Sequence, residues 1–353
     1  MGKIKHGQYW DVSWNPLKVK GGGFHCTKCS PGCLHCWAET LNIRFYNGKP
    51  YDNRKVEYVL DAKVLGQPMR RRIPTTYFVC DLCDLFHEAV PITHFWPDKP
   101  LGFIDKVMCE VIGWCPEHTF LILTKRPQGA LEYFRKFYAG LKEFHKGQEV
   151  KPLPQLHLGV SVSTQDEDWK IAELLKIQAA FRWLSIEPIL GKIDILSYPK
   201  IDNYQATAFS HYGSPDWYKP KYDGLNWVVI GAESIGGNAG RECKLEWVRD
   251  VVRQCDAASV PIHIKQIHLW QVKGVSKLFE TANQAKLHCG ECKVKRVLIK
   301  DVTKFPKDLR RQEYLKPIEN KSKENKLTKE EWDGSPSDLT RRYTAQWGLP
   351  KGF

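Results

Sequence analysis

The sequence lacks any long apolar run, and this absence narrows the classes of protein that it encodes. No such run among the 353 residues approaches the roughly 18–20 residues that cross a bilayer. The first six residues also lack the apolar stretch of a signal peptide. We therefore expect a cytoplasmic protein with no membrane partner.

Cysteine, by contrast, is plentiful. The chain has twelve, and four of them fall within eleven residues: Cys26, Cys29, Cys33 and Cys36. In a cytosolic protein, clustered cysteines indicate metal or redox chemistry rather than a disulfide framework. This cluster is the first candidate functional site.

The positive charge is concentrated near the end of the chain. The net charge is +13, of which residues 271–353 carry +8 and residues 1–270 carry +5. A basic segment fits a polyanionic partner, with nucleic acid as the first candidate. A solvated basic surface with no such partner explains the charge equally well.

Short apolar runs alternate with amphipathic stretches along the chain. The runs predict strands at 9–14, 77–80, 119–124, 156–162, 182–186, 227–230 and 261–265. The amphipathic stretches predict helices at 37–45, 104–114, 130–141, 169–180 and 245–257. This alternation predicts an α/β fold with a parallel sheet, a full or partial (β/α) barrel. In such folds the chemistry lies at the carboxyl ends of the strands.

Two segments interrupt the pattern. Residues 195–226 are rich in aromatic and polar residues without a clear period, and we interpret them as an insertion in the 1–270 core. Residues 271–353 form a basic C-terminal extension, within which 320–329 is a lysine-rich linker or exposed helix.

The spacing of the clustered cysteines allows two kinds of metal site. Cys29, Cys33 and Cys36 have the C-x3-C-x2-C spacing of radical S-adenosylmethionine (SAM) enzymes, in which three thiolates hold a [4Fe–4S] cluster. The pairs Cys26/Cys29 and Cys33/Cys36 could instead form a four-thiolate zinc site. The gap between the pairs is much shorter than in common zinc ribbons. We therefore favour the iron–sulfur cluster.

The chain also resembles the phage and prophage family named after gene products thirty-seven and sixty-eight, which is described as radical-SAM-like and of unknown function. The matching segments are 14–16, 26–39, 84–87, 119–127, 158–162, 184–191, 231–234 and 265–266. The resemblance implies a barrel of the radical SAM type and, for a phage-encoded protein, a location in the host cytoplasm.

The family pattern implies a different third cluster ligand. Its cysteines are spaced C-x6-C-x2-C, which maps onto Cys26, Cys33 and Cys36, and Cys29 stands where the family usually has an aliphatic residue. We take Cys26 as the third ligand and keep Cys29 as the alternative.

Further polar residues follow the predicted strands. Glu187 and Glu233 could accept hydrogen bonds from SAM or the substrate, or could bond loop amides. Lys125 and Arg126 could meet the SAM carboxylate or a phosphate, or form surface ion pairs. Asp84 is a further candidate for cofactor binding, and His87 is a candidate catalyst, although a lone histidine is more often structural. The catalytic candidates are His87, Glu187 and Glu233.

Two more CxxC pairs offer a candidate second metal site. Cys80 and Cys83 follow a predicted strand, and Cys289 and Cys292 lie in the basic extension. Together they could hold zinc or an auxiliary iron–sulfur cluster. Buried free thiols are the alternative, as we expect for Cys109, Cys115 and Cys255.

Together, these features predict a radical SAM enzyme that acts on a nucleic acid base or nucleotide. A [4Fe–4S] cluster would cleave SAM to a 5′-deoxyadenosyl radical, with an electron from a donor such as flavodoxin or ferredoxin. Exposed aromatic residues in the insertion could stack on an extruded base. The alternatives are a radical SAM enzyme acting on a peptide or small metabolite, and a zinc-stabilised nucleic-acid-binding protein without catalysis.

Overall fold

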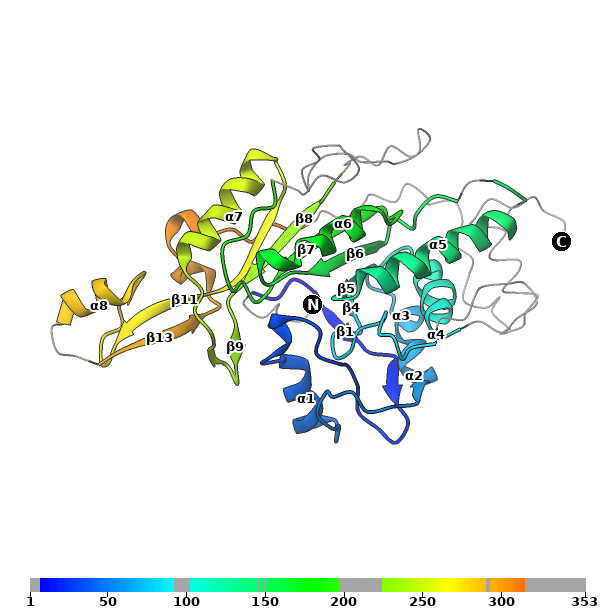
Figure 1. Cartoon of the computed structure of the whole chain (residues 1–353), viewed down its shortest axis with the longest axis horizontal. Coiled ribbons are helices and arrows are strands. Elements are labelled where there is room, and N and C mark those ends of the chain that lie inside the picture. Colours follow the sequence, from blue (N-terminus) through cyan, green and yellow to red (C-terminus); the bar gives the residue numbers. More distant parts are fainter. Residues whose placement is uncertain are drawn as a thin grey trace.

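Seven parallel strands form the centre of the protein, an α/β structure (Figure 1). The computed structural model describes residues 7–91, 102–144, 146–148, 150–196, 224–289 and 293–314. The parallel strands, in their order across the sheet, are β1 (Val12–Trp14), β4 (Thr76–Val79), β5 (Thr119–Thr124), β6 (Leu156–Ser161), β7 (Phe181–Ile186), β8 (Trp227–Gly231) and β11 (Ile262–Val272). Two antiparallel strands, β12 (Leu278–Phe279) and β13 (Val294–Ile299), pair with β11.

The predicted parallel sheet is therefore confirmed, and each predicted strand lies at or near its observed position. The helices are α1 (Trp37–Phe45), α2 (Ala62–Leu65), α3 (Gln67–Arg70), α4 (Phe103–Asp105), α5 (Pro127–Phe144), α6 (Trp169–Leu175), α7 (Leu245–Ala257) and α8 (Ala282–Cys289). The predicted helix at 104–114 is instead a succession of three short pieces: α4, the π-helix η2 (Lys106–Val111) and the 3₁₀ helix η3 (Ile112–Trp114).

Four short strands and four 3₁₀ turns complete the described structure. The strands form two antiparallel pairs, β2 (Leu17–Val19) with β3 (Tyr58–Leu60) and β9 (Ser234–Ile235) with β10 (Asn238–Ala239). The 3₁₀ turns are η1 (Pro31–Cys33), η4 (Gln165–Glu167), η5 (Val302–Lys304) and η6 (Lys307–Leu309).

One face of the sheet packs against helices. Along β8, Val228 and Ile230 point into the large core, and α5, α6 and α7 lie over this face (Figure 1). On α7, Val248, Val252 and Cys255 are buried at helical spacing, as an amphipathic helix requires. Burial of this apolar stripe fixes the helices on the sheet.

The other face curls around the ring of Tyr9. Its ring centroid lies 6.2 Å from that of Phe78 on β4 and 5.5 Å from that of His263 on β11. In a flat sheet, five strand spacings would separate β4 from β11 by about 24 Å. A single ring can contact both strands only because the sheet is strongly curved. The carboxyl ends of the strands are thereby gathered around one area.

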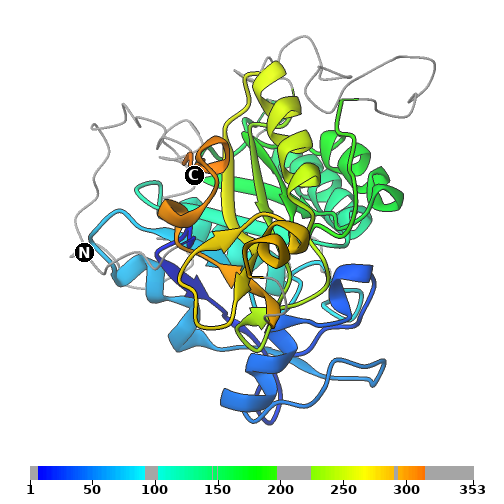
Figure 2. The same cartoon turned by 90° about the vertical axis from the view of Figure 1, so that its left-hand side faces the viewer.

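Beyond the sheet, β11 continues into a projecting arm. The second half of β11, with β12, α8 and β13, forms the narrow end of the molecule in Figure 1, and Figure 2 shows α8 in front when this end faces the viewer. The predicted border at position 270 falls within β11. Residues 197–223 of the predicted insertion and residues 315–353, which include the lysine-rich run, lie outside the described residues. Within the described chain, no helix is long and apolar enough to span a membrane.

Candidate metal centre

The four clustered cysteines lie on the loop between β2 and α1. Cys33 is buried in η1, Cys26 and Cys36 are partly buried, and Cys29 is exposed. Cys36 immediately precedes α1, as the sequence predicted for a loop that leads into a helix. The loop does not follow β1 directly, because β2, which the sequence did not predict, comes between them.

Glycines and one buried asparagine shape this loop. Gly21, Gly22 and Gly23 have φ values of 91°, 110° and 74°, which side-chain-bearing residues rarely adopt. Asn42 of α1 then accepts a hydrogen bond from Phe24 N at 2.8 Å and donates one to Phe24 O at 3.0 Å. The turn and these two bonds fix the start of the loop against α1.

The four thiols influence one another's ionisation. Burial raises the pKa of Cys26 to about 12 and also raises the pKa of Cys36. Cys29 donates a hydrogen bond to Cys33, which lowers the pKa of Cys33 and raises that of Cys29. The charge of Lys125 lowers the pKa of Cys33 further. One thiol, Cys33, thus ionises readily, and a metal ion would deprotonate the others on binding.

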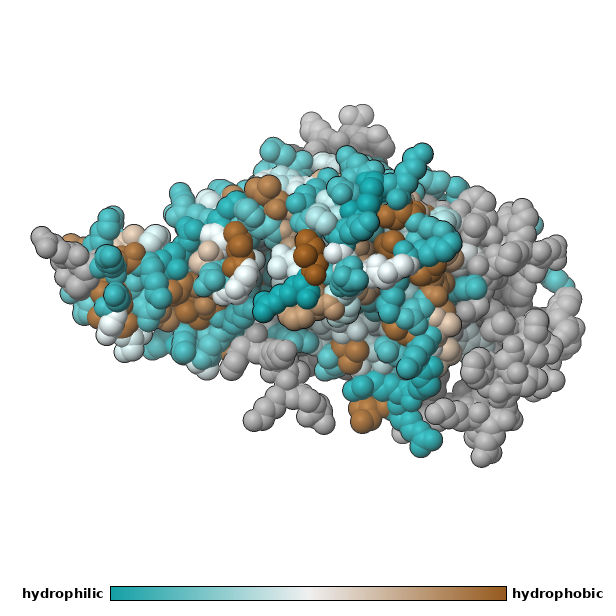
Figure 3. All heavy atoms as spheres, turned by 90° about the horizontal axis from the view of Figure 1, so that it is seen from below, coloured by the Kyte–Doolittle hydropathy of each residue, from teal (hydrophilic) through white to brown (hydrophobic). Residues whose placement is uncertain are grey.

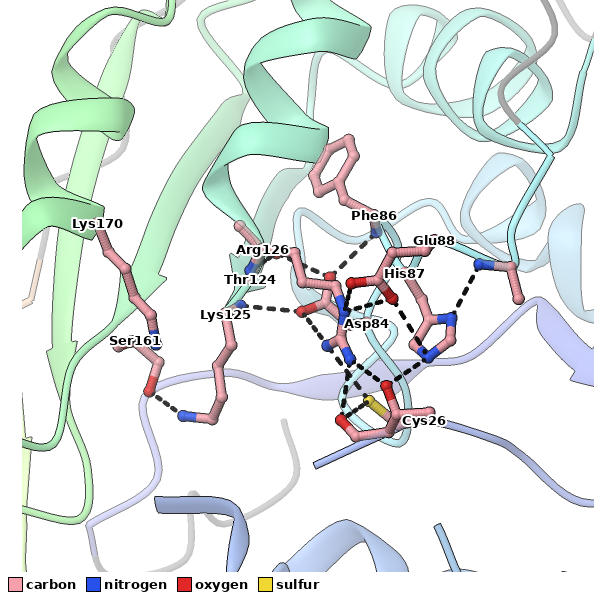
Figure 4. A network of polar contacts seen from close by, with 12 residues as sticks. Cys26, Asp84, Phe86, His87, Glu88, Thr124, Lys125, Arg126, Ser161 and Lys170 are labelled. Atoms are coloured by element: carbon pink, nitrogen blue, oxygen red, sulfur yellow. Dashed lines mark hydrogen bonds and ion pairs between the residues drawn. The ribbon is translucent and has the colours of Figure 1, made fainter. Parts of the chain in front are cut away.

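Arg126 ties the cysteine loop to the end of β5 (Figure 4). Its Nη1 lies 3.6 Å from Cys26 Sγ, and its Nη2 donates to Thr27 O at 2.9 Å and to Thr27 Oγ1 at 2.7 Å. On its other side, Nε donates to the carboxylate of Glu88 at 2.9 Å, and Nη1 lies 3.5 Å from Asp84 Oδ2. Arg126 is only 6% exposed and pairs with buried Asp84 as well as with Glu88, whose side chain is 71% exposed, so only one of its two ion pairs reaches the surface.

Asp84 holds the end of β5 in place. Its Oδ1 accepts hydrogen bonds from Thr124 Oγ1 at 2.8 Å and Phe86 N at 3.0 Å, and its Oδ2 accepts one from Lys125 N at 2.9 Å. Because these donors and Arg126 surround both carboxylate oxygens, we interpret Asp84 as a residue that positions Lys125 and Arg126.

His87 contacts the same loop. The amide N–H of Ala89 donates to Nδ1 at 3.1 Å, so Nε2 carries the ring proton and donates it to Thr27 Oγ1 at 3.0 Å. Burial and then the charge of Arg126 lower the pKa of His87. His87 is therefore neutral at pH 7, and its contacts position Thr27.

Lys125 extends from the end of β5 toward β6. Its Nζ donates to Ser161 Oγ, and Figure 4 shows the side chain passing on the cysteine side of the sheet. Further along the same edge, Glu187 follows β7, and its Oε1 lies 2.6 Å from Lys265 Nζ. Lys125 follows β5, Glu187 follows β7, and Lys265 lies within β11 near the point where its pairing with β8 ends.

Glu233 pairs with an arginine that the sequence did not single out. Arg241 donates to Glu233 Oε2 from its amide N at 2.8 Å and from Nε at 2.9 Å. Burial alone would raise the pKa of Glu233, but the hydrogen bonds from Arg241 outweigh it and lower this pKa. Arg241 Nη2 also donates to Pro31 O in the cysteine loop at 3.0 Å. Glu233 therefore acts on the loop through Arg241.

Sequence reasoning missed Thr27, Lys265 and Arg241 as functional residues. Thr27 lies between two of the motif cysteines, which was the available signal. Lys265 lies in one of the matching segments, and its partner Glu187 lies in another. No local pattern marks Arg241, because its partners Glu233 and Pro31 come from separate parts of the chain.

A buried hydroxyl without a partner also lies beside the loop. Ser163 Oγ, just after β6, has no hydrogen-bond partner, and a Cβ added to Gly32 would lie 2.4 Å from it. Gly32 therefore allows the cysteine loop to approach β6 closely. The hydroxyl itself is fully buried beneath the loop.

The other two CxxC pairs lie far from each other. Cys80 and Cys83 hydrogen-bond to each other, and the charge of Cys26 contributes to the raised pKa of Cys83, so this pair lies near the cysteine loop. Cys289 ends α8, which Figure 1 places at the far end of the arm from β4. Cys292 and the side chain of Cys289 are outside the described residues, and the shared second metal site stays a prediction.

The thiols of the cysteine loop are not gathered closely enough to hold a single zinc ion without moving. Zn–S bonds of about 2.3 Å place tetrahedral thiolates about 3.8 Å apart. Of the described His, Cys, Asp and Glu side chains, only those of Cys115, Glu117 and His118 place three donor atoms within 4.8 Å of one another. The loop sulfurs are therefore spread more widely than a single zinc ion requires. Arg126 and Lys125 bring positive charge to the loop cysteines.

Comparisons with known proteins leave the activity open. Neither the curated proteins nor the solved structures gave a significant match. A comparison with protein families matches residues 5–336 to a single description, "Protein of unknown function (DUF5131)". That match covers most of the chain, which therefore belongs to this family.

Proposed function

We propose that this protein is a radical SAM enzyme whose cysteine loop holds a [4Fe–4S] cluster. The observation that carries the proposal is the position of this loop. It presents Cys26, Cys33 and Cys36 beside the carboxyl ends of parallel strands, and Arg126 reaches it from β5. Carboxyl ends are where parallel α/β folds place their chemistry.

The sheet is consistent with a partial barrel of the radical SAM type. Seven parallel strands follow one another in chain order, and the curvature around Tyr9 gathers their ends. We expect the concave edge to bring side chains from several strands to one cofactor, as happens in (β/α) barrels.

Cys26, Cys33 and Cys36 are the proposed ligands, and Cys29 remains free to donate its hydrogen bond to Cys33. Held by these three thiolates, a [4Fe–4S] cluster would have one iron left to bind SAM. When bound, the cluster supplies the electron that splits SAM into methionine and a 5′-deoxyadenosyl radical. The electron would come from a donor such as flavodoxin or ferredoxin.

The charged residues around the loop have complementary roles in this proposal. Arg126 and Lys125 offset the negative charge of the thiolates, because oppositely charged groups stabilise each other strongly where water is scarce. Glu187, with Lys265, offers a carboxylate to the SAM ammonium or ribose. Asp84, His87 and Glu233 position the loop and its arginines.

The projecting arm supports a nucleic acid as the substrate. Five exposed lysines lie on its described part: Lys273, Lys277, Lys286, Lys293 and Lys295. Its single described carboxylate, Glu280, pairs with Arg249. A hollow of about 630 Å³ lies between residues 271–276 and 293–295. Seen from the side of α1, the arm is a narrow extension on which hydrophilic and hydrophobic residues are interspersed (Figure 3). Clustered lysines of this kind bind phosphate backbones.

The test is made on protein purified and reconstituted without oxygen. We expect about four irons and four sulfides per chain and formation of 5′-deoxyadenosine from SAM with dithionite as the reductant. Cys33→Ala should abolish both the binding of the iron–sulfur cluster and the cleavage of SAM. Cys255→Ala, which removes a buried thiol of α7, is the matched control and should retain both.

Other outcomes would overturn parts of the proposal. Zinc that is lost in Cys33→Ala, and therefore belongs to the cysteine loop, without SAM cleavage would contradict the enzymatic function and favour a zinc-stabilised nucleic-acid-binding protein. SAM cleavage without any binding to nucleic acid would keep the enzyme class and favour a peptide or small metabolite as the substrate.

A further inference from the structure

A second group of metal-ligand side chains lies at the opposite end of β5 from the cysteine loop. The sulfur of Cys115, a carboxylate oxygen of Glu117 and a ring nitrogen of His118 lie within 4.8 Å of one another. They belong to the tight turn between η3 and β5, in which His118 N donates to Cys115 O at 3.1 Å. The turn therefore gathers three donors of three different kinds.

The imidazole of His118 is buried and its orientation is fixed. Its Nε2 lies 3.0 Å from Pro68 O in α3, so Nε2 carries the ring proton and donates it to this carbonyl. The rings of Tyr77 and Phe120 pack against the imidazole, with centroids 5.3 and 6.2 Å away. The other nitrogen, Nδ1, keeps its lone pair, and no hydrogen-bond partner reaches it.

His263 and His268 share this arrangement, with Nε2 facing a backbone carbonyl and Nδ1 unpartnered, but among the described residues only His118 belongs to a group of three possible metal ligands. A buried acceptor without a partner destabilises a fold by about 1–3 kcal/mol. Metal-ligating histidines, in contrast, commonly donate their second ring N–H to a backbone carbonyl, which fixes the ring. The bond from Nε2 to Pro68 O has this form, and it leaves Nδ1 available for a ligand.

We propose that Cys115, Glu117 and His118 bind a zinc ion. Nδ1 of His118 is the unpartnered ring nitrogen, and Glu117 Oε1, which lies 3.9 Å from Nε2, would turn toward it. A thiolate and a carboxylate would neutralise the charge of the divalent ion, and sulfur, nitrogen and oxygen are all zinc ligands. The three donor atoms lie within 4.8 Å of one another, and binding zinc would require them to approach to about 3.5 Å. This is a small movement for side chains in one turn. The Glu117 side chain is 45% exposed, so water can occupy the fourth position.

The position of the site indicates a structural role. Thr119, the first residue of β5, follows His118 directly, and the amino ends of strands in such folds usually serve stability. A bound ion would connect the η3 turn to α3 through His118 and Pro68. The site is separate from the cysteine loop and does not depend on the proposed enzymatic function.

Zinc content per chain and thermal stability test the proposal. Cys115→Ala and Glu117→Gln should each bind one zinc ion per chain fewer than the wild-type protein, whatever the cysteine loop holds. Zinc should raise the Tm of the wild-type protein more than that of either variant. In a chelator competition, Cys115→Ala should weaken this site at least about 100-fold, the upper end of the loss seen for second-shell partners.

Two matched substitutions serve as controls. Cys255→Ala removes another buried thiol, and Glu246→Gln removes another exposed carboxylate, and both should keep the wild-type zinc content. Because Glu117 is largely at the surface, its variant should fold even if Cys115→Ala does not. Equal zinc content in the wild-type protein and in Glu117→Gln, with equal gains in Tm, would overturn the proposal.

Discussion

Arg126 Nη1 lies 3.6 Å from Cys26 Sγ, and the same guanidinium contacts Asp84 and Glu88. The arginine thus connects the cysteine loop with the acidic residues after β4. Burial alone would lower the pKa of Arg126, but the nearby negative charges, that of Asp84 first, raise it. The guanidinium is therefore charged at every pH at which the protein is folded.

Arg126→Gln should destabilise the protein and reduce its iron content after reconstitution. The substitution leaves Asp84 buried without its cation, and breaking such a pair costs about 3–5 kcal/mol. Urea unfolding and iron analysis measure the two effects. Arg135→Gln, at an exposed position of α5, should change stability by less than about 0.5 kcal/mol. If Arg126→Gln and Arg135→Gln lost similar amounts of stability and iron, the structure of the cysteine loop would not depend on Arg126.

Cys26 and Cys29 should differ when each is replaced by alanine. Cys26 is held beside Arg126, whereas Cys29 is exposed and donates to Cys33. Cys26→Ala should therefore lose nearly all SAM cleavage, and Cys29→Ala should retain most of it. Iron content and 5′-deoxyadenosine formation provide the measurement. The reverse result would make Cys29 the third ligand.

The fold was more accessible to sequence reasoning than the site. The predicted strands were correct because each buries several apolar residues of its own, a signal contained in a few consecutive positions. The pairs β2–β3 and β9–β10 have two or three residues per strand, too few for a periodic signal. Arg241 was missed because its partners, Glu233 and Pro31, meet it only after folding.

Acid should destabilise the protein partly through His157. Burial lowers the pKa of His157 to about 3, whereas an unfolded histidine titrates near about 6.5. Between these two pH values, His157 therefore binds a proton in the unfolded chain but not in the folded chain. This contribution to stability is complete above about pH 6.5 and is lost as the pH falls toward about 3, by up to about 1.4 kcal/mol per pH unit.

His157→Phe should reduce this dependence on pH. The phenyl ring can keep the stacking on Phe181, whose ring centroid lies 4.4 Å from that of His157. Between about pH 6 and pH 4, the free energy of unfolding of the wild-type protein should fall by about 2 kcal/mol more than that of the variant. Urea unfolding at several pH values gives both slopes, and equal slopes would mean that His157 is protonated in the folded protein.

Neutralising the arm should weaken binding to nucleic acid and reduce its dependence on salt. Lys273, Lys293 and Lys295 border the hollow between the strands of the arm. Changing all three to glutamine removes up to three phosphate contacts, which should reduce the slope of log K against log salt by about 2–3. Anisotropy of a labelled oligonucleotide measures this slope. The control changes the exposed residues Lys55, Lys142 and Lys151 to glutamine, with the same loss of charge. If both triple variants lose affinity equally, the binding reflects net charge and not the arm.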